Sequence, residues 1–283
     1  MALENCPLSS LLELDNTYAA RLAERRNTLA TQRHEVLGVT PEGRDAVLEF
    51  YRWVMGVYLP GRWPGIYVVE QEARKEERGG EDLTRGLRNT VTGELLPLKT
   101  NDAEVALETM GRNIDTEFLF LLPSSSSAIT TTTTPSESSN LPTYHLSSYI
   151  NTSPAGFSTR SKLCLSLSAI HGPVPGYSAK LEKSMDRFFA RLPVGKVVKR
   201  VNWSVSMTGE FFCLKGAHGV VDVAGVRKGE KQEQKEGEEA EMVDLKTTYV
   251  RCERQTLHRL PETGAVVFAF KVSFFLVFHP YIP

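Results

Sequence analysis

The alternation of apolar and polar residues near the end of the chain constrains the fold more than any other feature of the sequence. Residues 246–261 alternate along their length, which is the period of a half-buried strand. The tight turn Glu262–Gly264 follows, and the apolar residues 265–272 then return along a second strand. Two such runs joined by a short glycine-containing turn predict an antiparallel hairpin, so we expect the chain to contain an antiparallel sheet.

Helical patterns precede this β-rich end. The first predicted helix begins after Asp15 or Asn16 and extends to about Leu37, because its apolar residues fall near one face. Helices followed by mixed elements and an antiparallel end indicate the α+β class. The other predicted elements are helices over residues 41–60, 101–113 and 179–192, strands over 66–70, 115–123 and 196–207, and an exposed charged loop over 71–82.

Size and composition favour a single domain over residues 1–283. A chain of 283 residues with 41% hydrophobic residues has enough apolar side chains for one sizeable core. Residues 124–140 are rich in serine and threonine, and residues 227–242 are rich in charge. Neither segment buries enough apolar surface to offset the entropy of ordering, so both are predicted to be flexible insertions within that domain.

Charge and cysteine content exclude several classes of function. The net charge of -1 offers no general attraction for nucleic acid or an anionic membrane. No stretch reaches the roughly 18 apolar residues of a membrane-spanning helix, and the N-terminus does not resemble a signal peptide. The four cysteines are far apart, which argues against a zinc ribbon, an iron–sulfur cluster or a disulfide framework. We therefore expect a cytoplasmic protein that binds neither nucleic acid nor membrane.

One histidine lies at a corner of the chain that the sequence makes stiff. His171 ends an apolar run, and the sequence GPVPG follows it directly. The glycines permit close approach of the backbone, and the prolines stiffen the turn. Such a turn suits a metal ligand or a catalytic base, whereas the alternative is a histidine that bonds a backbone carbonyl and ends a helix. The residues before it, 163–171, fit a helix better than a strand.

The segment RCERQTLHR is the second candidate. On a strand its odd-numbered residues from Arg251 to Leu257 face one way, and its even-numbered residues from Cys252 to His258 face the other. Buried charges must be paired or bound to a ligand. The segment is therefore either a structural network of ion pairs, or a site in which Glu253 faces a cationic substrate or an arginine holds an anion. Trp203 in the strand 196–207 is predicted to be a core residue.

These segments together resemble a known family. The sequences IHGPVPGY, MDRFFARL, VNWSV and RCERQTLHRLPETGAVVFAF are similar, in order and wording, to the haem-dependent oxidative N-demethylase alpha-subunit-like family. The earlier segments YAARLAERRNTL and NIDTEFLFLLP fit the same family more loosely. The low-complexity insertions suggest a fungal or other eukaryotic member. After about residue 271 the chain departs from the family pattern, and we expect an atypical or truncated C-terminus.

The resemblance implies a PAS-like antiparallel sheet with flanking helices and an N-terminal helical segment, which holds haem b. It implies that oxygen oxidises a small secondary amine such as dimethylamine, and that one methyl group leaves as formaldehyde. Electrons would come from a separate NADPH-dependent reductase with flavin and an iron–sulfur cluster. This chain has neither a cluster of cysteines nor a dinucleotide-binding motif, which agrees with electrons that arrive from a partner.

We assign roles within these motifs to five residues. His171 is predicted to be the axial ligand of the haem iron, and Tyr177 to line the pocket. Glu253 is predicted to contact the substrate ammonium, and Arg254 or Arg259 to pair with a haem propionate. Two alternatives stay open. One is a PAS-like module that binds haem or a small ligand without catalysis, and the other is a cofactor-free structural protein in which His171 is only a turn residue.

Overall fold

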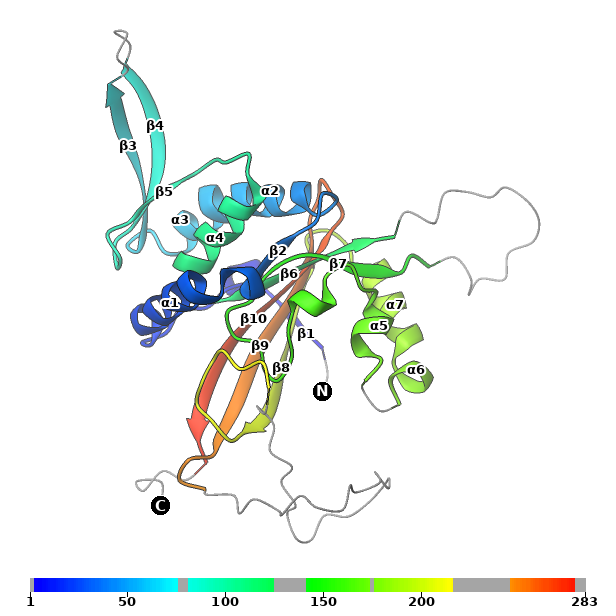
Figure 1. The fold of residues 1–283 in the computed structure, drawn as a ribbon. Coiled ribbons are helices and arrows are strands. Elements are labelled where there is room, and N and C mark those ends of the chain that lie inside the picture. Colours follow the sequence, from blue (N-terminus) through cyan, green and yellow to red (C-terminus); the bar gives the residue numbers. More distant parts are fainter. Residues whose placement is uncertain (1–2, 76–80, 125–140, 174–175, 216–244, 278–283) are drawn as a thin grey trace, which may run out of the picture.

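An antiparallel sheet of seven strands lies at the centre of the computed structural model, which describes residues 3–75, 81–124, 141–173, 176–215 and 245–277 (Figure 1). The strand order is β1-β8-β9-β10-β6-β7-β2, and a second sheet has the order β3-β4-β5. The strands are β1 (Glu4–Cys6), β2 (Leu37–Val39), β3 (Tyr67–Lys75), β4 (Glu81–Asn89), β5 (Leu95–Pro97), β6 (Glu117–Pro123), β7 (Tyr144–Ile150), β8 (Val197–Ser206), β9 (Tyr249–Arg259) and β10 (Val266–Leu276). The helical elements are η1 (Leu8–Ser10), α1 (Tyr18–Val36), α2 (Arg44–Trp53), the π-helical η2 (Val54–Tyr58), α3 (Leu59–Arg62), α4 (Ala103–Asn113), η4 (Arg160–Lys162), α5 (Leu167–His171), α6 (Tyr177–Lys180) and α7 (Glu182–Arg191).

The hairpin predicted at the end of the chain is confirmed, and with it the α+β class. β9 and β10 pair without interruption over the full length of both strands. The turn between them is held by Glu49 of α2, whose carboxylate accepts hydrogen bonds from the amides of Glu262 (2.7 Å) and Thr263 (2.9 Å). The C-terminal hairpin is therefore attached to an N-terminal helix as well as to the sheet.

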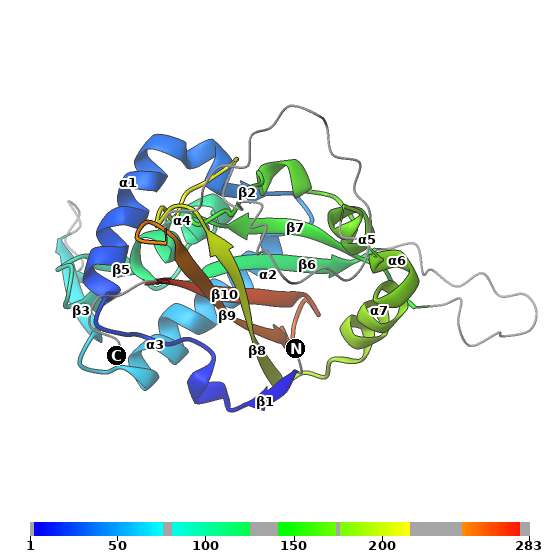
Figure 2. The ribbon, with the colours of Figure 1, turned by 90° about the horizontal axis from the view of Figure 1, so that it is seen from below.

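Adjacent residues of the central strands face two different cores. Val267 of β10 and Val197 of β8 belong to a large core, whereas their neighbours Val266 and Val198 belong to a smaller one. Helices α1–α4 pack in the large core, and α5 and α7 pack in the smaller one. Figures 1 and 2 show these two groups of helices on opposite sides of the sheet. Burial on both faces explains why the apolar run of β10 is nearly continuous from Val266 to Phe270.

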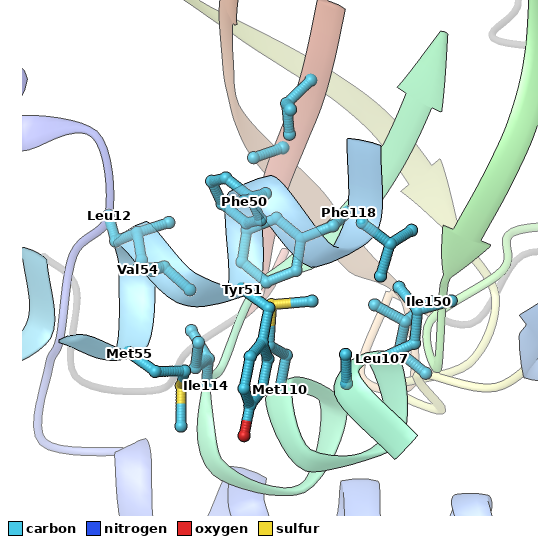
Figure 3. Close-up of a cluster of buried hydrophobic side chains, with 14 of the residues drawn as sticks. Leu12, Phe50, Tyr51, Val54, Met55, Leu107, Met110, Ile114, Phe118 and Ile150 are labelled. Atoms are coloured by element: carbon cyan, nitrogen blue, oxygen red, sulfur yellow. The ribbon is translucent and has the colours of Figure 1, made fainter. Parts of the chain in front are cut away.

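The large core is built where α2 crosses the sheet and meets α4 (Figure 3). Phe50 of α2 lies edge-on to Phe118 of β6, with ring centroids 5.1 Å apart. Leu107 and Met110 on the inner face of α4 are fully buried beside them. The predicted start of α4 is confirmed, because the Asp102 carboxylate caps the amides of the first turn at 2.8 and 3.2 Å.

Buried ion pairs join two motifs that are far apart in the sequence. Arg25 of α1 contacts Glu117 of β6, and their side chains are only 1% and 2% exposed. Arg21 contacts Asp115 at 3.3 Å, and Asp115 also binds Lys271 of β10 at 2.7 Å. Because a buried charge is costly without a partner, the arginines of YAARLAERR and the acidic residues of NIDTEF depend on one another.

The exposed charged loop predicted over residues 71–82 is wrong. Residues 71–75 and 81–82 are the paired ends of the strands β3 and β4. A two-stranded ribbon that leaves the body of the protein, as this one does in Figure 1, has little surface to bury. Its sequence therefore lacks the apolar face by which a strand is recognised.

Two further local predictions need correction. Trp203 of β8 is 60% exposed and is not a core residue. Of residues 163–171, only the last five form a helix, α5, because residues 163–164 form a turn in which Cys164 has φ = 68°, and Ser166 pairs with His145 of β7. The helices predicted over residues 16–37, 41–60 and 101–113 are confirmed within a few residues.

Parts of the sequence prediction fall on residues that the structure leaves undescribed. Of the two predicted insertions, residues 125–140 and 227–242 lie outside the described ranges. β10 continues past residue 271 and pairs with β9 as far as Leu276. Among the helices of the described ranges, none has the length and apolar character needed to cross a membrane.

Candidate functional site

His171 occupies the last position of the short helix α5. Ser166 caps this helix through its hydroxyl, which accepts from the Ala169 amide at 3.2 Å. The His171 Nδ1 lies 2.8 Å from the carbonyl oxygen of Leu167, one turn earlier. A carbonyl can only accept, so Nδ1 carries a proton, and in the neutral ring Nε2 then has the lone pair. This is the tautomer that a histidine needs in order to bind a metal through Nε2.

Tyr177 fixes the plane of this imidazole. The two rings are stacked, with centroids 4.9 Å apart and an interplanar angle of 13°. Tyr177 is buried, and its hydroxyl donates to the sulfur of Met185 in α7 at 3.4 Å. Burial raises the pKa of Tyr177, and the nearby carboxylates of Asp186 and Glu182 raise it further. Tyr177 is therefore a neutral, immobile support between α5 and α7.

The turn between the two rings depends on one glycine. Gly176 has φ = 71°, a left-handed conformation that side chains rarely adopt. It directly precedes α6, which begins at Tyr177. Val174 and Pro175 lie outside the described residues. The structure therefore places His171 and Tyr177 in contact, with Gly176 in a left-handed conformation directly before Tyr177.

The two faces predicted for β9 are confirmed. Leu257 packs in the smaller core with Leu167 of α5 and Phe189 of α7, so the odd-numbered residues face these helices. His258 packs against the rings of Phe50 and Trp53 in the large core, so the even-numbered residues face α2. Glu253 and Arg259 consequently lie on the same face as α5 and α7, whereas Arg254 lies on the opposite face.

Polar side chains form a continuous row on the odd-numbered face. Arg200 of β8 donates to Gln255 at 2.6 Å, and Gln255 donates to Glu253 at 2.9 Å. Glu253 pairs with Arg251 at 3.0 Å, and Arg251 donates to the Ser153 carbonyl at 2.7 Å. We call Arg200, Gln255, Glu253 and Arg251 the polar row. Its two guanidinium groups and one carboxylate leave a net charge of +1.

Two members of this arrangement could not be singled out from the sequence. Arg200 is directly opposite Gln255 in the register of β8 and β9, and this register is known only once the strands are paired. Ser153 lies on the loop after β7, and its hydroxyl donates to the buried Glu117 at 2.8 Å. The polar row is therefore connected through Ser153 to the buried ion pair of α1 and β6.

An apolar surface separates the polar row from α5 and α7. Phe268 and Phe270 of β10 lie on the odd-numbered face, opposite Leu257 and Gln255 of β9. Their rings are 5.6 Å apart, and Phe268 is only partly buried. The helices that cover the odd-numbered face carry His171 and Tyr177. Below them Phe268 and Phe270 form an aromatic surface, which we call the aromatic floor. The polar row lies farther along the strands.

Arg254 belongs to a different environment. Its guanidinium bonds the carbonyl oxygens of Ser10 and Leu11 and pairs with Glu13 at 3.0 Å. It lines a groove of about 640 Å³ on the even-numbered face, together with Asp15 and Lys271 among others. The structure therefore does not bring Arg254 together with His171.

Arg259 lies on the odd-numbered face but is occupied by structural contacts. It donates to the carbonyl oxygens of Leu192 (2.6 Å), Gly264 (2.6 Å) and Phe189, and to the hydroxyl of Tyr144 (3.0 Å). These contacts hold the end of α7 against the hairpin. They use four of the five N–H groups of the guanidinium, so a carboxylate could bind in a bidentate manner only by displacing one of them.

The odd-numbered face suits haem in part. His171 presents Nε2 as a free donor, the aromatic floor suits an apolar macrocycle, and Arg200 and Arg251 carry the charge that propionates require. Glu253 is less suited to bind an ammonium ion, because both of its oxygens already accept from Arg251 and Gln255. Among the described residues, no group of three or more His, Cys, Asp or Glu could hold a metal ion.

Comparison with known proteins gives one match. No curated protein matches the chain. A family model described as "Haem-dependent oxidative N-demethylase, alpha subunit-like" matches residues 2–278. This match includes the helices of the large core, the polar row and the His171 turn in one continuous span. The chain therefore belongs to the haem-dependent oxidative N-demethylase alpha-subunit-like family.

Proposed function

We propose that this protein binds haem b and catalyses the oxidative N-demethylation of a small secondary amine of the dimethylamine type. The observation that carries this proposal, beyond the family, is the free Nε2 of His171 on a ring fixed by Leu167 and Tyr177. A histidine that served only to end a helix would need the bond to the carbonyl. It would have no need of the stacked, buried tyrosine.

Five residues have roles in the proposal. His171 would hold the haem iron, and Tyr177 holds the His171 ring in one orientation. Arg200 and Arg251 of the polar row bind the haem propionates, in place of the Arg254 or Arg259 expected from the sequence. Glu253 holds Arg251 directly and Arg200 through Gln255, and its remaining lone pairs accept from the substrate ammonium.

Haem, when bound, supplies the activation of oxygen and the oxidation of the N-methyl carbon. Dimethylamine, oxygen, two electrons and two protons would give methylamine, formaldehyde and water. The electrons come from a separate NADPH-dependent reductase with flavin and an iron–sulfur centre. The apolar floor of Phe268 and Phe270 keeps water from the reacting carbon, because aromatic side chains leave it no hydrogen-bonding partner.

A second candidate function is a PAS-like module that binds haem without catalysis. It is favoured by one observation, namely that both carboxylate oxygens of Glu253 already accept hydrogen bonds. A carboxylate so engaged, beside two guanidinium groups, attracts an ammonium ion weakly. Both candidates require haem, so they differ only in turnover.

The first experiment is an absorption spectrum of the full chain produced with a haem precursor. We expect a Soret peak in the wild type, a lost or shifted peak in His171→Ala, and an unchanged peak in His34→Ala. His34 is an exposed histidine of α1 and is the matched control. No peak in the wild type would refute both haem functions, and an unchanged peak in His171→Ala would assign the iron to another ligand.

The second experiment separates the two candidates. Formaldehyde release is measured with dimethylamine, NADPH and a reductase that has flavin and an iron–sulfur cluster. Demethylation predicts release that depends on the amine, and Glu253→Gln should raise the KM for the amine while the haem spectrum stays unchanged. If the protein binds haem but releases no formaldehyde in response to the amine, its function is haem binding without catalysis.

A further inference from the structure

The outer edge of β8 is open over most of the strand. β1 pairs only with residues 197–199, so residues 200–206 have no strand beside them on that side among the described parts of the chain. In an antiparallel strand alternate residues direct their N–H and C=O groups to each side, so main-chain donors and acceptors point outward here. The other edge strand of the same sheet, β2, has only three residues, which is how proteins usually limit such an edge.

Exposed apolar side chains line the same edge. Val201 is 52% exposed and Trp203 is 60% exposed, and both lie on one face with Val205. The other face of the edge carries Arg200, Asn202 and Ser204. In Figure 1 the far ends of β8, β9 and β10 extend beyond all the labelled helices. An indole so exposed on an unpaired strand is typical of an interface, because tryptophan contributes strongly to association.

The sequence of this edge is complementary to itself. When two copies of residues 200–206 are aligned antiparallel with Trp203 opposite Trp203, Val201 lies opposite Val205 and Asn202 opposite Ser204. Arg200 then lies opposite Ser206, so no like charges face each other in any pair. Apolar residues meet on one face and polar residues on the other, which is the pairing that stabilises antiparallel strands.

We propose that the protein is a homodimer in which the β8 strands of two copies pair antiparallel about Trp203. The arrangement has a two-fold axis at Trp203, as a self-complementary interface requires. It joins the two central sheets into one continuous sheet and satisfies the outward main-chain groups of both copies. It also places the two indoles side by side between Val201 and Val205 of both copies.

In this register Trp203 is the only residue of β8 that lies opposite the same residue of the other copy. Substitution at this position is therefore a specific test. In Trp203→Lys two ammonium groups would meet at the axis, and in Trp203→Glu two carboxylates would meet. We expect the wild type to sediment as a dimer and each variant to associate at least about tenfold more weakly. A mixture of the two variants should form a heterodimer, because Lys then faces Glu.

Phe275→Lys is the matched control. Phe275 is 59% exposed on the same face of the sheet but lies on β10, two strands from the edge. Edge pairing predicts that this variant stays dimeric, whereas face-to-face packing predicts that it dissociates. A monomeric wild type, a dimeric Trp203→Lys, or a Lys and Glu mixture that fails to associate would each overturn the proposal. A monomeric wild type that binds the reductase only when Trp203 is present would assign the edge to that partner instead.

Discussion

At the scale of single residues, some charged side chains of this protein are buried rather than exposed, and they lie beside the groups that bond them. Arg25 is only 1% exposed and is satisfied by Glu117, the Gly111 carbonyl at 2.8 Å and the Thr116 carbonyl at 3.0 Å. Glu117 in turn accepts from the Thr152 amide at 2.8 Å. This fully bonded pair links α1, α4, β6 and the loop that supports the polar row. Its role is therefore to fix positions as much as to add stability.

Glu117→Gln should strongly destabilise the protein. The change keeps the shape of the side chain but leaves the buried Arg25 without a counter-charge. We expect the free energy of unfolding, measured by urea denaturation, to fall by about 3–5 kcal/mol. Arg33→Gln is the control, because Arg33 is 46% exposed and its pairs with Glu104 and Glu108 are worth less than about 1 kcal/mol. Equal losses in the two variants would contradict this account.

His258 makes the protein sensitive to acid. Its ring is buried and has no hydrogen-bond partner among the described residues, and burial lowers its pKa from 6.5 to about 4. The unfolded chain therefore takes up the proton first as the pH falls. The stability from neutral His258 is complete above pH 6.5 and is lost progressively as the pH falls towards 4.

Wild type and His258→Leu should differ in this pH window. Between pH 6.5 and pH 4 the wild type should lose on the order of 3 kcal/mol more than the variant, since each pKa unit is worth about 1.4 kcal/mol. Urea denaturation at a series of pH values measures the difference. Parallel curves for the two proteins would show that His258 is neutral in both states or binds its proton in the fold.

At the scale of elements, close helix packing holds α1 and α4 on the sheet. A Cβ atom on Gly111 of α4 would lie 2.8 Å from Cγ1 of Ile150 in β7 and 3.2 Å from Cδ1 of Leu29 in α1. The absence of a side chain at Gly111 thus allows a helix, a neighbouring helix and a strand to meet at one point. This contact brings Arg25 of α1 within reach of Glu117.

Gly111→Ala and Gly56→Ala should have opposite effects. Alanine is the better helix former by about 1 kcal/mol, and a Cβ on Gly56 meets no atom within 4 Å, so Gly56→Ala should maintain or raise the melting temperature. Gly111→Ala should instead destabilise the fold by about 1–3 kcal/mol, because the added methyl overpacks the core. Thermal unfolding by circular dichroism distinguishes them. A stabilised Gly111→Ala would mean that α4 can shift at little cost.

At the scale of the whole molecule, the sheet separates a structural half from the proposed functional half. α1–α4 and the large core lie on one side, and α5–α7 with the polar row lie on the other. Ser153 is one contact between the halves, because it bonds Glu117 through its hydroxyl and Arg251 through its carbonyl. A ligand on the odd-numbered face should therefore stabilise the entire fold.

Haem should raise the melting temperature of the full chain. At free haem near one hundred times its Kd, binding adds about 2.7 kcal/mol, which corresponds to a rise of about 5 °C for a protein of this size. The apoprotein is titrated with haem and followed by thermal denaturation. His171→Ala should show a much smaller rise and His34→Ala the full one. An equal rise in wild type and His171→Ala would indicate that haem binds away from His171.

Local pattern was enough to predict several elements of the fold. The alternation of residues 246–272 specifies the β9–β10 hairpin, Asp102 specifies the start of α4, and the odd and even residues of β9 divide between two faces as expected. These features depend on neighbours within a few positions, where the periods of strand and helix determine which side chains lie together.

The surroundings of each face were decided only by the tertiary structure. Alternation already placed Glu253 and Arg254 on opposite faces, but only the fold shows that the face of Glu253 is the one covered by α5 and α7, and that Arg254 pairs with Glu13 on the other. The sequence predicted that Trp203 is a core residue, because it lies in a strand whose residues alternate. No other part of the described chain buries Trp203. Periodicity states which residues share a face. What covers that face depends on pairings between distant segments, such as Arg200 with Gln255 and Arg25 with Glu117.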